Sequence, residues 1–346
     1  MNFEHVTLHN VAATASIGAG RELRRLPEDT RGELNDLAKW QYRRPAGVEI
    51  RFIQDGPVDI TLSASQERER ETDIEHASGE VAVEVFRGPF DARQRTTVGT
   101  EPQTITVPEP AEQLEGLDPD VAADLRFDPA VCRLLFRGDP LVLHEIDGET
   151  REPEDEDVPD QRLLTYGTSI TQGVAATREH LTYARQTARH LGADLLNLGT
   201  GGSCYCETAI GDHLATRDDW DRAILALSVN MMKPFTVDEF RERAREVVEA
   251  VAATGRPVTA VTLYPSFYDL CPERGLENDA EAFRDALREI VIDVPGDVQL
   301  VEGPDVLRDI GELTTDLIHP GDNGMVDMGR ALAQRLDDGS SSESFI

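Results

Sequence analysis

The chain has 346 residues, of which 34 are Lys or Arg and 66 are Asp or Glu, so its formal net charge at pH 7 is −32. A basic surface that neutralises nucleic-acid phosphates is therefore not expected, and no apolar stretch is long enough to span a bilayer. The length exceeds that of a typical single domain and favours two domains.

The acidic residues are spread through every segment, whereas Lys39 and Lys233 are the only lysines. A dispersed acidic surface almost without lysine is typical of a halophilic protein, because high salt screens the self-repulsion. The first residues show no basic and apolar signal sequence, and the four cysteines form no metal-ligand pattern. We therefore expect a cytoplasmic protein with reduced thiols and without a metal or another cofactor. Its oligomeric state stays open.

Residues 1–148 are predicted to form an all-β domain, a sandwich or jelly roll. Apolar and polar residues alternate in several short segments, as they do in strands with one buried face. These segments are residues 48–53, 58–62, 81–86, 103–107, 131–136 and 141–146. Gly56 and Pro57 predict a hairpin turn between the first two segments. Residues 34–40 are compatible with a short helix.

Residues 149–161 are acidic and almost devoid of apolar side chains, so they are predicted to be a solvated linker. From residue 162 to 338 the pattern changes to alternating strands and helices. Apolar runs predict strands at residues 163–166, 194–198, 223–228, 258–263 and 298–301, with amphipathic helices between them. Such repeats predict a five-stranded parallel sheet with helices on both faces. Residues 339–346 are predicted to be a flexible tail.

Polar residues follow four of these predicted strands. Ser169 follows the first strand, residues 199–203 follow the second, Asn230 follows the third, and Asp316 and His319 follow the fifth. Because the carboxyl ends of parallel strands meet at one edge of a sheet, we expect these residues to lie together. The sequence therefore predicts a site at that edge.

The residue types at this edge suit nucleophilic catalysis. A serine hydroxyl needs a base, and His319 is the histidine in a suitable loop, with Asp316 three residues earlier to orient its ring. The backbone N–H groups of Ser169 and Gly202 and the side-chain amide of Asn230 can donate to an oxyanion. Asp316 and His319 can also be read as metal ligands, although no further ligands cluster with them in the sequence.

Four segments carry a family resemblance in their order along the chain. They are Tyr-Gly-Thr-Ser-Ile-Thr-Gln-Gly at 166–173, Asn-Leu-Gly-Thr-Gly-Gly at 197–202, Ser-Val-Asn-Met at 228–231 and Asp-Leu-Ile-His-Pro at 316–320. They resemble the four blocks of the SGNH (GDSL-type) hydrolases, and the resemblance covers residues 161–338. The third block of that family has glycine and aspartate where this chain has Ser228 and Met231. With the preceding β domain, the chain is most similar to a branch of carbohydrate esterases and acyltransferases.

The resemblance implies a flavodoxin-like α/β/α sandwich. It also implies Ser169 as nucleophile, His319 as base, Asp316 as its orienting acid, and Ser169, Gly202 and Asn230 as the oxyanion hole. The predicted function is a metal-independent serine esterase that acts through an acyl-enzyme on a small acyl ester, acetyl first, of a small molecule or carbohydrate. An acyltransferase with the same triad and a non-catalytic carbohydrate-binding protein stay open as alternatives. The predicted substrate-binding residues are Phe235, Tyr264, Phe267 and Tyr268.

Overall fold

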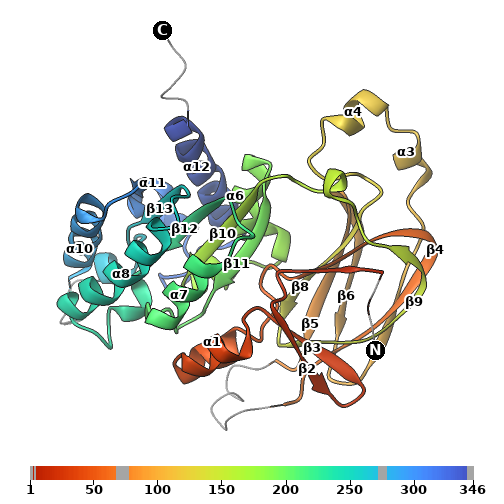
Figure 1. Ribbon diagram of the computed structural model, residues 1–346, viewed down its shortest axis with the longest axis horizontal. Helices are drawn as coiled ribbons and strands as arrows, with labels where there is room; N and C mark the ends of the chain where they lie inside the picture. The colour runs from red at the N-terminus through yellow and green to blue at the C-terminus, as the bar shows by residue number, and fades with distance from the viewer. Residues whose placement is uncertain (1–2, 4, 68–77, 272–278, 341–346) are drawn as a thin grey trace. The chain divides into compact units, whose positions relative to one another are not determined.

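The computed structural model describes residue 3 and residues 5–67, 78–271 and 279–340, which form two compact units (Figure 1). The first unit draws on Met1–Glu28 and Tyr42–Asp160, and the second on Asp29–Gln41 and Gln161–Ile346. This division differs from the expected one in two segments: residues 29–41 belong with the C-terminal unit, and residues 149–160, the expected linker, belong with the first unit.

The expected linker and tail also differ from the observed elements. The linker begins inside a strand, because β9 (Leu141–Arg151) pairs with β4 as far as Arg151. The last helix, α12 (Asp322–Ser340), includes the first two residues of the expected tail. The rest of that tail, residues 341–346, lies outside the described residues.

The first unit is an antiparallel β-sandwich in which one long strand, β4 (Glu49–Ala64), takes part in both sheets. The first residues of β4 pair with β1 and β8, and β8 extends that sheet to β5 and β6. The later residues of β4 pair with β7 and β9, and β9 extends to β3 and β2. The other strands are β1 (Thr7–His9), β2 (Ala13–Ile17), β3 (Gly20–Arg24), β5 (Val81–Arg87), β6 (Phe90–Val98), β7 (Gln103–Val107) and β8 (Cys132–Gly138). The short helices of this unit are α3 (Glu112–Glu115), α4 (Pro119–Ala123) and the 3₁₀ turn η2 (Asp155–Asp157).

Alternate side chains of these strands form the core of the sandwich. Leu134 and Phe136 of β8 and Val83 and Val85 of β5 are buried in it, as the alternating pattern predicts. The strand β6 was not expected from the sequence, because nearly all of its side chains are exposed and no apolar alternation marks it. It ends the strand order, where an edge strand tolerates polar residues.

The predicted hairpin at Gly56 and Pro57 is wrong, because β4 runs through both residues. The pairing of β4 with β9 shifts register between Asp55 and Asp59, which marks an irregularity in the ladder. Pro57 has no N–H to donate to a ladder, and Gly56 has a φ of +88°, which other residues rarely adopt. The two residues therefore interrupt the pairing of a continuous strand instead of reversing the chain.

The second unit is built on a five-stranded parallel sheet with the strand order β11-β10-β12-β13-β14. Its strands are β10 (Arg162–Gly167), β11 (Asp194–Gly199), β12 (Arg222–Ala226), β13 (Val258–Val261) and β14 (Val298–Val301). The order reverses at β10, which has β11 on one side and β12 on the other. This is the flavodoxin-like arrangement, and the five predicted strands are confirmed. The carboxyl ends of the strands around β10 form its topological switch point, where ligands bind in such sheets.

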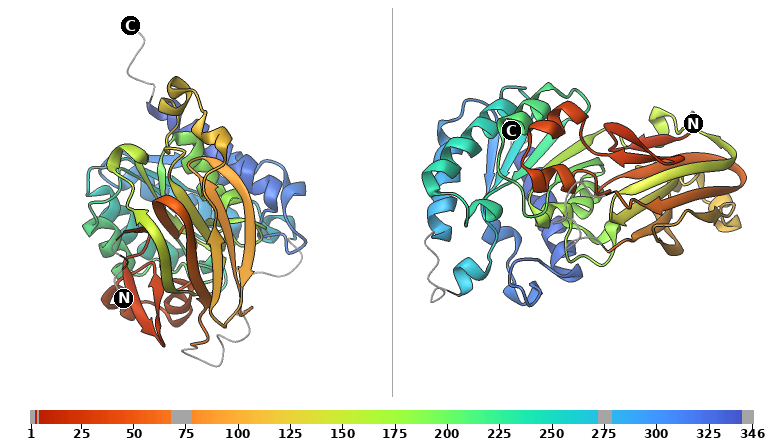
Figure 2. Two further views of the ribbon diagram at one scale, coloured as in Figure 1. Left: turned by 90° about the vertical axis from the view of Figure 1, so that its right-hand side faces the viewer. Right: turned by 90° about the horizontal axis from the view of Figure 1, so that it is seen from below.

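Helices cover both faces of this sheet (Figure 2). On one face, α6 (Tyr183–Leu191) and α12 bury apolar side chains against Leu163, Leu195 and Ile224 of the strands. The other long helices of the unit are α7 (Thr208–Thr216), α8 (Val237–Ala252) and α10 (Ala280–Asp293). Its short elements are α1 (Glu28–Glu33), α2 (Asp36–Gln41), α5 (Ser169–Gln172), α9 (Phe267–Leu270), α11 (Gly303–Val306), and the 3₁₀ turns η3 (Glu179–Leu181), η4 (Val229–Met231) and η6 (Ile310–Glu312). Within the described part of the chain, no helix has both the length and the apolar character that a membrane span requires.

Candidate active site

Ser169 is the first residue of the short helix α5, which begins directly after β10. Thr168 caps this helix, since its hydroxyl oxygen accepts a hydrogen bond from the N–H of Ile170 at 3.4 Å. The N–H groups of Gly173 and Val174 both donate to the Ser169 carbonyl, at 3.0 and 2.9 Å, and so end the helix after one turn. These contacts hold Ser169 at the carboxyl end of β10, where it is 7% exposed.

Ser169, His319 and Asp316 form a continuous hydrogen-bonded chain. The Ser169 Oγ lies 2.7 Å from Nε2 of His319, and Nδ1 of His319 lies 2.7 Å from Oδ2 of Asp316. A carboxylate accepts hydrogen bonds, so the Asp316 contact favours the imidazole tautomer that carries its proton on Nδ1. In that tautomer Nε2 has a free lone pair and can accept the serine proton. The structure therefore brings Ser169 into contact with His319, which lies 150 positions away in the chain, and His319 into contact with Asp316, three positions before it.

The Asp316 carboxylate is held by more than the imidazole. Its Oδ1 accepts hydrogen bonds from the N–H groups of Ile318 and His319, at 2.8 and 2.9 Å, and from the Thr314 hydroxyl at 2.9 Å. Partial burial raises the pKa of the Asp316 carboxyl, but the hydrogen bonds from His319, Ile318 and Thr314 outweigh it and hold that pKa well below its ordinary value. Asp316 therefore stays ionised at neutral pH and can stabilise an imidazolium beside it.

Backbone hydrogen bonds fix the loop that carries these two residues. Leu317 takes a φ of +56°, and its N–H donates to the Thr314 carbonyl at 2.9 Å. The N–H of Thr314 donates to the His319 carbonyl at 2.8 Å. A further bond comes from α9, because the N–H of Phe267 donates to the Leu317 carbonyl at 2.7 Å. The loop is thus closed on itself and attached to the segment after β13.

The loop after β11 presents its amides in a distinctive way. The N–H groups of Gly199, Thr200 and Gly201 are all taken, by Asn197 Oδ1 at 2.8 Å, the Gly167 carbonyl at 2.9 Å and Gln172 Oε1 at 2.7 Å. The next two amides, of Gly202 and Ser203, have no acceptor among the residues that the structure describes. Gly202 has a φ of +68°, which glycine adopts without strain. Its N–H is therefore available to a ligand.

The orientation of the Asn230 amide follows from its contact with Cys204. The N–H of Cys204 donates to Asn230 Oδ1 at 3.2 Å, which identifies the oxygen end of the amide and leaves Nδ2 to donate elsewhere. Asn230 belongs to the turn η4, which follows β12. The residue before this turn, Ser228, has φ +100° and ψ −60°, a conformation that favours glycine. Ser228 thus keeps the backbone course of a glycine at the position where the related family has one.

Of the predicted substrate-binding residues, three are half-buried and one is in the core. The rings of Phe267 and Tyr268 stack with centroids 4.2 Å apart, and Phe235 is also half-buried. Tyr264 is 5% exposed and lies in the core cluster, edge-to-face with Tyr183. A ring in that position offers little surface to a substrate.

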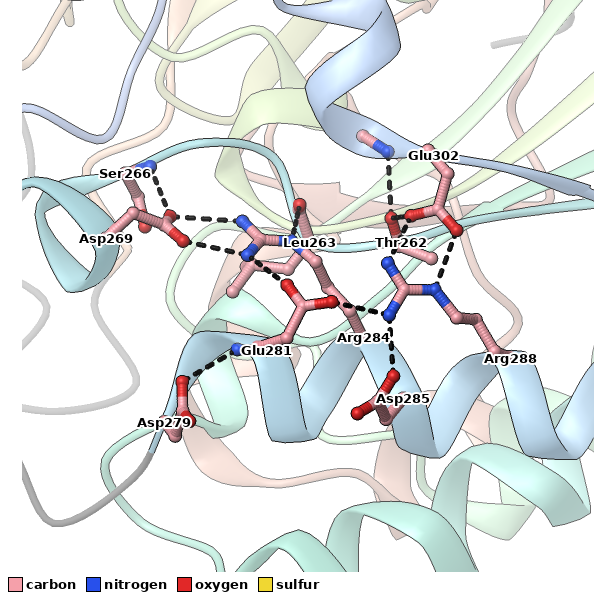
Figure 3. Close-up of polar contacts among 11 residues, drawn as sticks. Thr262, Leu263, Ser266, Asp269, Asp279, Glu281, Arg284, Asp285, Arg288 and Glu302 are labelled. Atoms are coloured by element: carbon pink, nitrogen blue, oxygen red, sulfur yellow. Dashed lines mark hydrogen bonds and ion pairs between the residues drawn. The ribbon is translucent and has the colours of Figure 1, made fainter.

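A buried arginine holds the segment of Phe267 and Tyr268 in place (Figure 3). Arg284 of α10 donates to the Leu263 carbonyl at 3.0 Å and to the two carboxylate oxygens of Asp269, at 2.8 and 3.1 Å. Asp269 in turn accepts from the N–H of Ser266 at 3.0 Å, at the start of α9. The guanidinium therefore ties α10 to the connection between β13 and α9.

Asp316 and His319 were also considered as metal ligands. Within the described ranges, no group of three or more His, Cys, Asp or Glu residues is placed to hold a metal ion. Asp316 and His319 instead contact each other and the Ser169 hydroxyl.

Several residues that hold this site together carry no signal in the sequence. Thr314 supports Asp316, Phe267 supports its loop through a backbone N–H, and Gln172 accepts the N–H of Gly201. Gln172 lies in a segment already singled out, but its partner is 29 positions away. Such contacts depend on tertiary packing, so no local pattern marks them.

Comparison with known proteins places the chain in a family. Residues 160–337 match the family model described as the GDSL-like lipase/acylhydrolase family. No curated protein matches the chain in sequence.

Several solved structures share the fold, among them the following three. A salicylyl-acyltransferase from a tetracycline biosynthetic pathway is 13% identical, with a TM-score of 0.70 over 97% of this chain and 95% of that one. A protein described as a GDSL-like lipase, from Bacteroides ovatus, is 17% identical, with a TM-score of 0.70 over 97% and 95%. A carbohydrate esterase family 2 enzyme with a carbohydrate-binding domain, from Corynascus thermopiles (Myceliophthora fergusii), is 15% identical, with a TM-score of 0.58 over 93% and 99%.

The family match covers more than half of the chain, and it falls on the unit that contains Ser169, Asp316 and His319. At these low sequence identities, the likeness to the three structures shows a shared fold. The chain therefore belongs to the GDSL-like lipase/acylhydrolase family and is an enzyme of the class that hydrolyses ester bonds.

Proposed function

We propose that the protein is a metal-independent serine esterase in which Ser169 is the nucleophile, His319 the general base and Asp316 the residue that orients it. The observation that carries this proposal is the hydrogen-bonded chain from Ser169 Oγ through the imidazole to Asp316, with 2.7 Å at each step. A nucleophile, a base and an orienting group within hydrogen-bond reach are the signature of nucleophilic catalysis.

In the first half of the reaction, Ser169 Oγ attacks the ester carbonyl carbon while His319 Nε2 takes the hydroxyl proton. The carbonyl oxygen becomes an oxyanion, and we propose that it is held by the N–H groups of Ser169 and Gly202 and by Nδ2 of Asn230. These three groups support the proposal because none of them has an acceptor among the described residues. The imidazolium, stabilised by Asp316, then protonates the leaving alkoxide, and an acyl-enzyme remains on Ser169.

In the second half, water takes the place of the departed alcohol. His319 removes a proton from the water, and the resulting hydroxide attacks the acyl carbon through a second oxyanion held by the same donors. The C–O bond to Ser169 breaks, the serine oxygen recovers the proton from His319, and the carboxylic acid leaves. The enzyme returns to its starting state without any change in oxidation level.

We propose a small acyl ester as the substrate, with acetyl as the first choice and a carbohydrate as the alcohol. This choice rests on the resemblance to carbohydrate esterases. The half-buried stacked rings of Phe267 and Tyr268 support it, because an aromatic ring can pack against the apolar face of a sugar. Phe267 also contacts the loop of His319 through its backbone. Together with Phe235 these are the proposed substrate-binding residues, and we leave Tyr264 out because it is buried.

An acyltransferase is the second candidate, since an alcohol can replace water in the second half of the same mechanism. The arrangement of Ser169 and His319 serves both reactions equally. The two are separated by product analysis with and without an added acceptor alcohol. A new ester that forms in proportion to the acceptor, at the expense of free acid, identifies a transferase.

The nucleophile is tested by covalent labelling with a fluorophosphonate in high salt, together with turnover of chromogenic acetyl esters and acetylated sugars. We expect Ser169→Ala to abolish labelling and to lower kcat by roughly three or more powers of ten. Ser63→Ala is the matched control, because Ser63 also bonds a histidine, with its Oγ 2.8 Å from Nε2 of His144. Labelling that persists in Ser169→Ala would refute the assignment.

A further inference from the structure

The loop that presents Gly202 depends on a side chain from the helix of Ser169. Gln172 is the last residue of α5 and is 5% exposed, and its Oε1 accepts the N–H of Gly201 at 2.7 Å. Because glycine has no Cβ, residues 201 and 202 restrict their own backbone torsions weakly. External hydrogen bonds must therefore set the direction of the Gly202 N–H.

Gln172 is in turn held by a residue from a distant part of the chain. Its Nε2 donates to Oε1 of Gln41 at 3.0 Å, and Gln41 is 6% exposed at the end of α2. The Gly201 N–H can only donate, so it fixes Oε1 as the end of the Gln172 amide that faces it and leaves Nε2 to face Gln41. The order Gln41, Gln172, Gly201 is thus a buried line of two hydrogen bonds with a single direction.

A second set of hydrogen bonds from the same N-terminal segment holds the other side of the loop. Asn35 Nδ2 donates to the Ser203 carbonyl at 3.0 Å and to Glu207 Oε1 at 2.6 Å, and the Asn35 N–H donates to Glu207 Oε1 at 3.0 Å. Asn35 also accepts the N–H of Ala38 at 3.0 Å, which caps α2. The loop is therefore held by residues 35–41 on both sides of Gly202.

We infer that Gln172, supported by Gln41, is a positioning residue for the proposed oxyanion donor Gly202, and that Asn35 holds the same loop through the Ser203 carbonyl. The inference rests on the proposed function, in which the Gly202 N–H contacts the oxyanion. Through these hydrogen bonds, residues 35–41 help to position a proposed catalytic group of the second unit. It links the nucleophile and the oxyanion loop through one helix, since Ser169 and Gln172 begin and end α5.

The test compares an ester with the thionoester that carries sulfur in place of the carbonyl oxygen. Sulfur is larger and accepts weaker hydrogen bonds, so the oxyanion donors stabilise its transition state less. We expect Gln172→Met to lower kcat for the ester about ten- to a hundredfold with KM changed less than about twofold. The rate for the thionoester falls much less, so the ester-to-thionoester ratio falls. Gln41→Leu changes the ratio in the same direction, whereas Gln41→Glu retains the acceptor and the wild-type ratio.

Gln186→Met is the matched control for lost stability. Gln186 is equally buried and donates to the His180 carbonyl at 2.6 Å, away from the loop. We expect it to lower stability while leaving the ratio unchanged. A Gln172→Met enzyme that keeps the wild-type ester-to-thionoester ratio, because it slows equally on both substrates or not at all, overturns the inference. Failure of the proposed function gives a different result. In that case the wild type is not labelled by the fluorophosphonate, and Ser169→Ala turns over the ester as fast as the wild type.

Discussion

Ser228 is a strained residue two positions before the Asn230 amide. Its φ of +100° and ψ of −60° are rarely adopted by L side chains, and its side chain is fully buried. A residue in such a conformation costs on the order of 1–3 kcal/mol, which surrounding contacts must offset. This backbone strain lies directly before η4, the turn that carries the proposed oxyanion donor Asn230.

We therefore expect Ser228→Gly to raise the free energy of unfolding by about 1 kcal/mol, after the greater backbone entropy of glycine in the unfolded chain is subtracted. Ester turnover is retained, because the backbone course does not change. Chemical denaturation of the two proteins measures the difference. Ser63→Gly is the control and loses stability, since Ser63 does not have a positive φ. A destabilised Ser228→Gly protein contradicts the claim of strain.

At the scale of elements, the connection between β13 and α9 depends on α10. Arg284 is 4% exposed and bonds Leu263 and Asp269, while the neighbouring Arg288 bonds both carboxylate oxygens of Glu302, at 2.8 and 2.9 Å (Figure 3). The hydrogen bonds from Arg288 hold the pKa of Glu302 below its ordinary value. One helix thus fixes the segments after two strands.

We expect Arg284→Met to lower the free energy of unfolding by about 2–4 kcal/mol, because the buried Leu263 carbonyl loses this donor and the Asp269 carboxylate loses its ion pair with the buried guanidinium. A urea titration measures the loss. Arg330→Met provides the comparison, since Arg330 and its partner Asp327 are both more than half exposed, and it changes stability by less than about 0.5 kcal/mol. Equal losses of unfolding free energy in the two variants would show that the hydrogen bonds of Arg284 stabilise the protein no more than an exposed ion pair does.

At the scale of the whole molecule, the net charge of −32 acts against the compact state in dilute buffer. We propose that the protein is adapted to high salt. We expect its Tm and its ester turnover to rise together as potassium chloride increases from about 0.1 M to several molar, because the Debye length falls from about 10 Å to below about 3 Å. Thermal unfolding and initial rates across that series test the proposal. Full stability and activity at the lowest salt concentration count against it.

Stability also depends on pH through His213 of α7. Burial, and next the charge of Arg217, lower the pKa of His213 from 6.5 to about 4. Between these values the unfolded chain binds a proton that the folded chain does not, so stability rises with pH. The contribution is complete above pH 6.5 and is lost progressively as the pH falls to about 4.

We expect this loss to amount to about 2–3 kcal/mol. Urea midpoints measured from pH 4.5 to 7.5 for the wild type and for His213→Gln isolate it, since the amide does not titrate. The variant has the shallower pH dependence over this window. Parallel curves for the two proteins exclude a role for His213.

Local patterns account for most of the second unit. The apolar runs of β10 to β14 and the amphipathic pattern of α8 fall where the sequence predicts them, because burial of one face leaves a periodic trace in consecutive residues. The four sequence blocks predict Ser169, Gly202, Asn230, Asp316 and His319 as site residues, and hydrogen bonds join three of them, Ser169, His319 and Asp316, in the structure. In the first unit the same rule failed for β6, whose exposed face carries no apolar alternation, and at Gly56 and Pro57.

The amino-acid sequence by itself determined the parallel sheet, the sandwich and the residue types available for chemistry, since these depend on periodicity and composition within short windows. Tertiary structure decided how the chain is divided into two units and which backbone N–H groups have a hydrogen-bond acceptor. It assigned residues 29–41 to the catalytic unit, paired Gln41 with Gln172, and left the Gly202 amide without an acceptor among the described residues. The physical reason is that a hydrogen bond requires a partner at the right distance and angle, and when that partner lies 131 positions away only packing can bring it there.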